Sequence, residues 1–251
     1  RVRANDTDYR YRPDSAFTHL TGWGSATVPG AVLLIDARDR SVKEKLYLLP
    51  TAGKESDEFF ANPAIGEFWV GPRPTLTEVE TQLGIKTENI NKLEKHLEKL
   101  PKPLSLKNEK LAITLSEMRF VKDEWEISQM RKAVETTIAG FGDVAASLPI
   151  ASRKARGERV IETAFFSRAR QEGYDIGYET IAASGPHACI LHWTKNDGDV
   201  KAGDLILVDA GVELDSLYTA DITTTIPVSG KVSKEPRWVY DTVLEAADAA
   251  S

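Results

Sequence analysis

Cysteine and long apolar runs are almost absent from this sequence, and each shortage excludes a class of protein. Cys189 is the only cysteine among the 251 residues, so no internal disulfide can form and the disulfide frameworks of small secreted domains are excluded. The longest apolar runs, such as residues 31–35 and 205–208, fall far short of the roughly 18 residues that span a membrane. We therefore expect a cytoplasmic protein without a membrane-spanning segment.

An excess of positive charge and low-complexity sequence are also lacking. Acidic residues number 38 against 32 basic ones, for a net charge of -6, and no Lys/Arg tract dominates. A basic surface that binds nucleic acid is therefore disfavoured. Apolar residues make up 41% and charged residues 28% of the 251 residues, without internal repeats. This composition is typical of a globular protein, and the length favours two domains.

Short β-like runs predict a small α/β domain in residues 1–121. Residues 31–37 and 46–49 are rich in strand-favouring side chains, and the charged stretch between them is typical of a hairpin connection. Apolar residues at helical spacing predict an amphipathic helix over residues 88–100. A further β-like run at residues 111–115 comes near the end of this domain.

A long helix is predicted to open the second domain. Asp123, with Glu126 three residues later, matches the capping box with which many helices begin. Apolar residues then recur at helical spacing on one face of this helix: Ile127, Met130, Val134, Ile138 and Phe141. We expect the domain boundary just before this helix.

The second domain, residues 122–251, also contains a β-rich segment at residues 180–228. A second helix over residues 160–169 should end at Gly173, and a third helix should run over residues 238–250. Two helices that precede a β-rich segment predict an α+β fold.

The most informative stretch is residues 205–227, in which two strand-like runs flank a turn. A turn centred on Asp215 would place Asp209 directly opposite Asp221 in an antiparallel hairpin. Directly opposed like charges destabilise a sheet unless something compensates them, and a divalent cation such as Mn²⁺, Mg²⁺ or Co²⁺ suits carboxylate oxygens. The alternative is that a bulge separates the two aspartates, which are then ordinary turn and edge residues.

A histidine lies in an apolar and aromatic setting just upstream of this hairpin. His192 lies between Leu191 and Trp193, and such a lone histidine is either a hydrogen-bonded core residue or a catalytic one. His187 is expected in an exposed turn, and Cys189 is expected to be a small buried hydrophobe. The residues alone leave both interpretations of His192 open.

Four motifs resemble a known enzyme family, and together they extend over the whole chain. The sequence is similar to the Xaa-Pro aminopeptidases (aminopeptidase P) of the metal-dependent pita-bread family, which also includes prolidase, methionine aminopeptidase and creatinase. The motifs are NDTDYRYRPDSAF at residues 5–17 with LTG at 20–22, VKDEWEI at 121–127, ACILHW at 188–193, and VDAG at 208–211 with ADIT at 220–223. The first is particular to the aminopeptidase P type, and the last is shared by the metallopeptidase branch.

The resemblance implies a creatinase-like α/β domain over residues 1–121, followed by the first part of a pita-bread α+β metallopeptidase domain over residues 122–251. It implies that Asp209 and Asp221 are metal ligands in a centre of two divalent ions. Mn²⁺ is the first choice, and Co²⁺, Zn²⁺ or Mg²⁺ are the alternatives. It also implies that His192 binds the substrate and takes part in catalysis by contacting the reacting peptide group.

The activity implied by the resemblance is removal of the amino-terminal residue from peptides with proline in second position, by metal-activated hydroxide that attacks the Xaa-Pro bond. The alternatives are a prolidase, which cleaves Xaa-Pro dipeptides, and a peptide-binding pita-bread protein without catalysis. The resemblance places further metal ligands downstream of Asp221. We therefore expect either a missing carboxy-terminal segment or a protein that has lost the catalytic half of the fold. In both cases we expect no activity from the 251 residues alone, and we expect assembly into a homo-oligomer.

Overall fold

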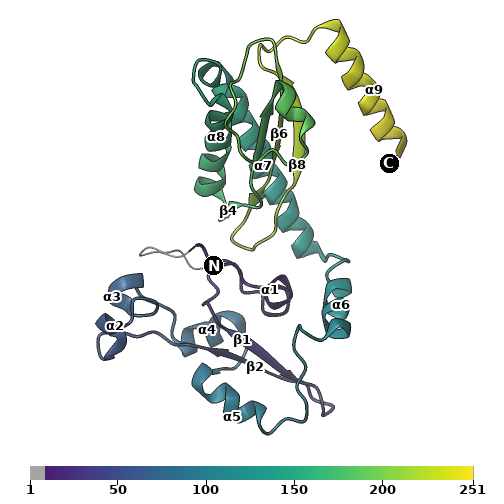
Figure 1. The fold of residues 1–251 in the computed structure, drawn as a ribbon. Helices are drawn as coiled ribbons and strands as arrows, with labels where there is room; N and C mark the ends of the chain where they lie inside the picture. Colours follow the sequence, from purple (N-terminus) through teal and green to yellow (C-terminus); the bar gives the residue numbers. More distant parts are fainter. Residues whose placement is uncertain (1–8, 251) are drawn as a thin grey trace. The chain divides into compact units, whose positions relative to one another are not determined.

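The computed structural model describes residues 9–250, and the chain divides into two compact units, Arg1–Lys122 and Asp123–Ser251 (Figure 1). The domain boundary proposed from the sequence lies one residue before this division. Residues 5–8, with which the first family motif begins, lie outside the described residues. None of the helices between residues 9 and 250 has both the length and the apolar character needed to cross a membrane.

The first unit is built on a three-stranded sheet. β1 (Val32–Asp36) pairs antiparallel with β2 (Lys43–Leu48), which confirms the predicted hairpin. β3 (Thr87–Asn89) pairs parallel with β2 on its other side. Buried apolar residues from the sheet and its surroundings form one core: Trp23, Val28, Leu46, Leu48 and Val79. Most of this core is carried by the middle strand and by the segments that flank the sheet.

Four short helices precede β3 in this unit. They are α1 (Ser15–Thr21), α2 (Glu58–Ala61), α3 (Glu67–Val70) and α4 (Leu76–Leu83). α1 begins at Asp14, whose carboxylate accepts a hydrogen bond from the Ala16 amide at 2.8 Å. It ends at Gly22, whose φ of 68° is in the left-handed region that favours glycine at a helix end.

Two sequence predictions in this unit are wrong. Residues 88–100 do not form one helix, because Glu88 belongs to β3 and pairs with β2. The chain then forms the short elements η1 (Ile90–Lys92) and α5 (Leu93–Leu97). Residues 111–115 are not a strand but part of α6 (Glu109–Met118), because Asn108 caps a helix there and accepts a hydrogen bond from the Leu111 amide at 3.0 Å.

The second unit begins with its longest helix, α7 (Glu124–Ala151). The predicted capping box is confirmed. The Asp123 carboxylate accepts a hydrogen bond from the Glu126 amide at 2.8 Å, and the Glu126 carboxylate accepts one from the Asp123 amide at 2.9 Å. The helix therefore begins where the sequence predicts it.

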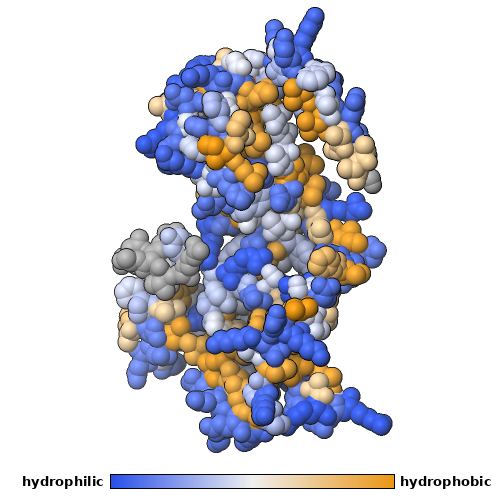
Figure 2. All heavy atoms as spheres, turned by 45° about the vertical axis from the view of Figure 1, so that its right-hand side comes forward, coloured by the Kyte–Doolittle hydropathy of each residue, from blue (hydrophilic) through white to orange (hydrophobic). Residues whose placement is uncertain are grey.

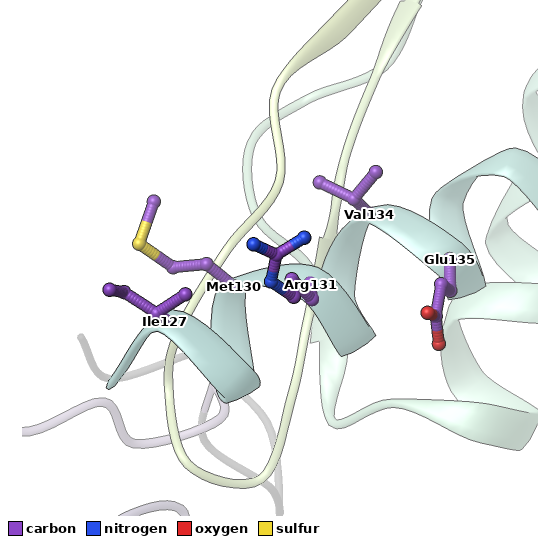
Figure 3. Close-up of a pocket in the computed structure, with 5 residues that line it drawn as sticks. All are labelled: Ile127, Met130, Arg131, Val134 and Glu135. Carbon is purple, nitrogen blue, oxygen red and sulfur yellow. The ribbon is translucent and has the colours of Figure 1, made fainter. Parts of the chain in front are cut away.

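The apolar face predicted for α7 is largely exposed rather than packed within this unit. Ile138 on this face is 59% exposed. Figure 3 shows a pocket on the helix surface, lined by Ile127, Met130, Arg131, Val134 and Glu135. The opposite face packs instead, and Gly140 allows it, since a Cβ there would lie 2.7 Å from the Phe165 ring. The buried face of α7 carries Ala133, Gly140, Val144 and Leu148, and Phe141 of the predicted face also packs against the core.

A three-stranded antiparallel sheet lies against α7 and α8 (Gly157–Glu172) in this unit (Figure 1). Its strand order is β5 (Ile181–Ser184), β6 (Leu205–Ala210) and β8 (Ile222–Pro227). Every second residue of β6 is buried in the core that the two helices share with the sheet: Ile206, Val208 and Ala210. Because side chains alternate along a strand, Asp209 lies on the sheet face away from those helices.

The remaining elements of this unit are β4 (Asp175–Ile176), η2 (Gly185–Cys189), β7 (Val212–Glu213) and α9 (Lys234–Ala250). The predicted end of α8 at Gly173 is confirmed. α9 begins before residue 238, where the prediction started it, because Pro236 in its first turn is compatible with a helix. No residue of α9 is buried, and Figure 2 shows apolar side chains on the surface of this unit.

Candidate functional site

The register of the β6–β8 hairpin corrects one expectation from the sequence. Asp209 pairs with Thr223, not with Asp221. The reason is the loop, in which the Leu217 amide donates a hydrogen bond to the Leu214 carbonyl at 2.8 Å. Leu217 has a φ of 65°, a left-handed conformation typical of the last residue in a three-residue hairpin loop. This loop is centred one residue later than expected and shifts the pairing by two residues.

A shift of two residues keeps both aspartates on the same face of the sheet. Asp221 is therefore the diagonal neighbour of Asp209, and diagonal residues lie roughly 7 to 8 Å apart in an antiparallel pair. Asp209 is half-buried and Asp221 is exposed. The two carboxylates are close enough to act on one group, although they do not oppose each other directly.

The group between them is the hydroxyl of Tyr178. It lies 2.6 Å from Asp209 Oδ1 and 2.9 Å from Asp221 Oδ1. A tyrosine hydroxyl has one proton to donate, so the two carboxylates share a single donor. Burial raises the pKa of Tyr178 well above its usual range, and its hydrogen bonds to the two aspartates and their negative charges raise it further.

Two glycines allow the segment that carries Tyr178 to approach the hairpin. The Gly177 amide donates a hydrogen bond to the Gly211 carbonyl at 2.8 Å. A Cβ on Gly177 would lie 2.1 Å from Thr219 Cγ2, and a Cβ on Gly211 would lie 1.6 Å from the Ala220 carbonyl oxygen. Any larger residue at either position would push the Tyr178 segment or the hairpin out of place.

Hydrogen bonds also tie the hairpin to α7. The Val212 amide donates to Thr137 Oγ1 at 3.0 Å, and the hydroxyl of Tyr218 donates to Glu126 Oε1. Burial raises the pKa of Tyr218, and the hydrogen bond to the Glu126 carboxylate raises it further. The position of the two aspartates is therefore held from the strand, from the loop and from the long helix.

His192 lies elsewhere in the unit, on the loop that follows η2. Its side chain is exposed, so it is not a core histidine. In the described part of the chain, no hydrogen bond or ion pair joins it to Asp209 or Asp221. The structure thus brings the two proposed ligands together but does not join the proposed catalytic residue to them.

Both expectations for the neighbours of His192 are wrong. His187 is not simply an exposed turn residue, since its Nδ1 donates to Glu158 Oε1 at 2.7 Å and its ring stacks on Trp193. Cys189 is exposed rather than buried, because it is the last residue of η2, a short helix with no buried residue. Sequence reasoning also missed Tyr178 and Glu158, which no local motif marks.

The donor chemistry of the two aspartates fits a hard divalent cation. Carboxylate oxygens are the ligands that Mn²⁺ and Mg²⁺ prefer. Two negative side chains that share one hydroxyl proton leave most of their charge uncompensated. Among residues 9–250, however, no group of three or more His, Cys, Asp or Glu side chains could hold a metal ion. A metal ion at Asp209 and Asp221 would therefore need further ligands.

Comparison with protein families supports the two-part organisation of the chain. Residues 1–108 match the model of the aminopeptidase P N-terminal domain, and residues 128–251 match that of metallopeptidase family M24. The chain is 40% identical over 268 residues to Xaa-Pro aminopeptidase 1 of Streptomyces coelicolor, with 99% of this chain and 53% of that protein covered. It is also 40% identical over 267 residues to Xaa-Pro aminopeptidase 2 of the same organism, with 99% of this chain and 56% of that protein covered.

Solved structures give the same result. A putative aminopeptidase P from Bacillus anthracis aligns with a TM-score of 0.77 at 25% identity, over 97% of this chain and 62% of that one. The low-pH form of aminopeptidase P from Escherichia coli aligns with a TM-score of 0.76 at 26% identity, over 98% of this chain and 60% of that one. The chain spans about half the length of the curated relatives from Streptomyces.

The fold is that of a pita-bread metallopeptidase, and residues 128–251 place the chain in metallopeptidase family M24. Within that family it is of the aminopeptidase P type, with an aminopeptidase P amino-terminal domain followed by part of the pita-bread domain.

Proposed function

We propose that this protein is a metal-dependent aminopeptidase that removes the amino-terminal residue from peptides with proline in second position. The observation that carries the proposal is the convergence of Asp209 and Asp221, from one face of a hairpin, on one hydroxyl. The similarity to the two Xaa-Pro aminopeptidases of Streptomyces coelicolor supports the choice of substrate.

Asp209 and Asp221 are the residues that would hold divalent metal ions, with Mn²⁺ as the first choice and Co²⁺, Zn²⁺ or Mg²⁺ as alternatives. When bound, such ions polarise a scissile carbonyl and activate water near neutral pH. The further ligands that the family resemblance implies belong to the part of the relatives that this chain does not span.

Tyr178 and His192 have separate roles in this proposal. Tyr178 orients the two carboxylates, because its hydroxyl can donate to either Oδ1 atom and its segment is wedged against the hairpin. His192 lies on an exposed loop, where its imidazole can donate a hydrogen bond to a peptide group that enters from solvent. Such a donor stabilises the negative charge that develops on the carbonyl oxygen during peptide hydrolysis.

No observation on residues 9–250 favours a prolidase or a peptide-binding protein without catalysis. A prolidase would use the same two carboxylates, so only the substrate distinguishes it. A protein that only binds peptides has no need of two acidic side chains that share one donor. We also propose a cytoplasmic location and a homo-oligomeric assembly, which follow from the single cysteine and from the family resemblance.

The test is hydrolysis of three peptides, with Mn²⁺, by the intact protein, which here means the protein that includes the expected carboxy-terminal segment. We expect release of the first residue from an Xaa-Pro-containing tripeptide and little release from the matched Xaa-Ala tripeptide. Slow cleavage of the Xaa-Pro dipeptide is expected from an aminopeptidase, whereas preference for the dipeptide would indicate a prolidase. A chelator should abolish the reaction, and added Mn²⁺ should restore it. Hydrolysis that persists after complete metal removal would contradict the proposal.

A further inference from the structure

Glu158 is a fully buried carboxylate (0% exposed) in the first turn of α8, and it accepts four hydrogen bonds. Its Oε1 accepts from the Ser184 amide at 2.8 Å and from His187 Nδ1 at 2.7 Å. Its Oε2 accepts from Trp193 Nε1 at 2.8 Å and from the Gly198 amide at 2.7 Å. Both carboxylate oxygens are therefore saturated by donors from one continuous segment.

That segment is the loop over residues 185–198, which carries His192. Ser184 is the last residue of β5 and precedes the loop, whereas Gly198 lies at its far end. The other two donors, His187 and Trp193, lie within the loop, and Trp193 is the direct neighbour of His192. One side chain of α8 thus binds this segment at both of its ends and at two points between them.

Packing around this carboxylate leaves little room for another arrangement. The rings of His187 and Trp193 stack with their centroids 3.8 Å apart and an angle of 23° between the planes. A Cβ on Gly198 would lie 2.6 Å from the His187 ring and 2.8 Å from Glu158 Oε2. Both donor side chains and the donor backbone are therefore held against the carboxylate at close range.

Apolar contacts do not hold the outer part of this loop. Leu191 is 84% exposed, and its neighbours Ile190 and His192 are also exposed. The one other buried polar side chain in the loop, Asn196, accepts a hydrogen bond from the Ala182 amide and donates one to the Thr180 carbonyl, at 2.9 and 2.8 Å. Burial of a carboxylate costs free energy unless the carboxylate is hydrogen-bonded, so an apolar side chain would fill the core better than Glu158. A fully hydrogen-bonded carboxylate is suited to hold a polar loop in one conformation.

We propose that Glu158 is a positioning residue, which holds the 185–198 loop so that His192 is presented to the peptide substrate. The inference rests on the proposed function, because it takes from there the role of His192. Glu158 itself is buried beneath the loop and touches neither substrate nor metal; it acts through the residues that it binds.

The test compares Glu158→Gln with Glu162→Gln in the intact protein with Mn²⁺. Three of the four partners of Glu158, two amides and an indole N–H, can only donate, so the amide nitrogen of glutamine would face a donor. We expect kcat on the Xaa-Pro tripeptide to fall by roughly tenfold to 100-fold, the scale seen when a residue that orients a site residue is lost. KM and bound Mn²⁺ should not change. Glu162, half-buried on the same helix, should keep wild-type kcat.

A double variant separates positioning from a general structural role. In the His192→Ala background, Glu158→Gln should cause no further loss of kcat, because its effect passes through His192. Loss by the same factor in both backgrounds would overturn the proposal, and so would wild-type kcat in Glu158→Gln alone. If His192→Ala itself keeps wild-type kcat, the role proposed for His192 in catalysis is wrong. The positioning role of Glu158 is then wrong as well.

Fluorine NMR provides a readout that does not depend on activity. The chain has five tryptophans, and labelling with 5-fluorotryptophan gives each its own signal. Glu158→Gln should shift or broaden the Trp193 signal, assigned by its loss in Trp193→Phe, and should leave the others in place. An unchanged Trp193 signal would contradict the inference.

If Glu158→Gln does not fold, Trp193→Phe takes its place in the kinetic test. This variant removes one of the four donors but keeps a ring that can stack on His187. It should lower kcat by a smaller factor, again without further loss in the His192→Ala background. Wild-type kcat, or an equal loss in both backgrounds, would overturn the proposal.

Discussion

Asp209 lies diagonally across the β6–β8 hairpin from Asp221, and the two carboxylates share the hydroxyl of Tyr178 at 2.6 and 2.9 Å. The diagonal arrangement leaves more space between the carboxylates than direct opposition would. It also places a single proton donor between two negative groups, so the pair is incompletely compensated and is suited to bind cations.

Replacement of either aspartate should weaken metal binding. Asp209→Asn and Asp221→Asn each remove a negative oxygen from a site that needs deprotonated ligands. Loss of a residue that merely orients a ligand costs about tenfold to 100-fold in affinity, so we expect loss of the ligand itself to cost more than about 100-fold. Titration calorimetry with Mn²⁺ on the intact protein measures this. Asp215→Asn, at the exposed tip of the same hairpin, should leave Mn²⁺ affinity unchanged.

Tyr178→Phe should destabilise the metal-free protein more than the Mn²⁺-loaded protein. The variant leaves both carboxylates without their shared donor, and a hydrogen bond to a charged group contributes roughly 1.5 to 3 kcal/mol, less where solvent reaches it. A bound cation would compensate the same charges, so the difference in free energy of unfolding should shrink when Mn²⁺ is added. Urea unfolding with and without Mn²⁺ measures both values. Equal destabilisation in the two conditions would show that Tyr178 has no special relation to the proposed metal site.

Gly211→Ala should disrupt the hairpin. Its new Cβ would lie 1.6 Å from the Ala220 carbonyl oxygen, a backbone atom that can move only if the strands separate. We expect a loss of roughly 3 kcal/mol or more in the free energy of unfolding. Gly203→Ala is the matched control, because nothing lies within 4 Å of its Cβ position, and its effect should stay within about 0.5 kcal/mol. Similar unfolding midpoints for the two variants would contradict the close approach of the strands.

The Tyr218–Glu126 hydrogen bond should make stability depend on alkaline pH. The folded chain holds the pKa of Tyr218 above its ordinary value of 10.0, through burial and through Glu126. The unfolded chain therefore loses this proton first, so the stabilisation is complete below about pH 10 and declines as the pH rises above it. Tyr218→Phe should flatten the fall in unfolding free energy above pH 10. If the fall of unfolding free energy above pH 10 has the same slope in this variant, groups other than Tyr218 cause it.

His192→Ala should reduce kcat on an Xaa-Pro tripeptide by roughly 10² to 10³, the scale for loss of one donor to the transition state. Bound Mn²⁺ and the melting temperature should remain those of the wild type, because the side chain is exposed. Near-normal kcat would exclude His192 from the chemistry.

The sequence predicted the hairpin and its two aspartates on one face, because strand periodicity survives a shift of two residues. It did not predict the register. The register depends on Leu217, which has a positive φ. Leucine rarely adopts this conformation, so the sequence does not predict it here. Tyr178 could not be predicted either, since it meets the aspartates across 31 and 43 residues of chain. Its contact depends on how the segment packs rather than on any local pattern.

Helix ends were predicted well where a side chain caps them, as at Asp123. They were predicted poorly where strand pairing takes residues out of a helical pattern. Glu88 belongs to a helical pattern in the sequence but pairs with β2 in the structure. The apolar face of α7 was predicted from spacing, but spacing does not tell which face meets a partner. In this unit Gly140, Val144 and Leu148 lie on the buried side of α7, and of the predicted face Phe141 packs against the same core.

Hydrolysis of an Xaa-Pro tripeptide by the intact wild-type protein, Asp209→Asn and Asp221→Asn, assayed together with Mn²⁺, tests the central claim most directly. We predict chelator-sensitive release of the first residue by the wild type and its loss, by at least about 100-fold, in both variants. Wild-type turnover in either variant would contradict the account, and so would a wild-type protein that binds Mn²⁺ but releases nothing.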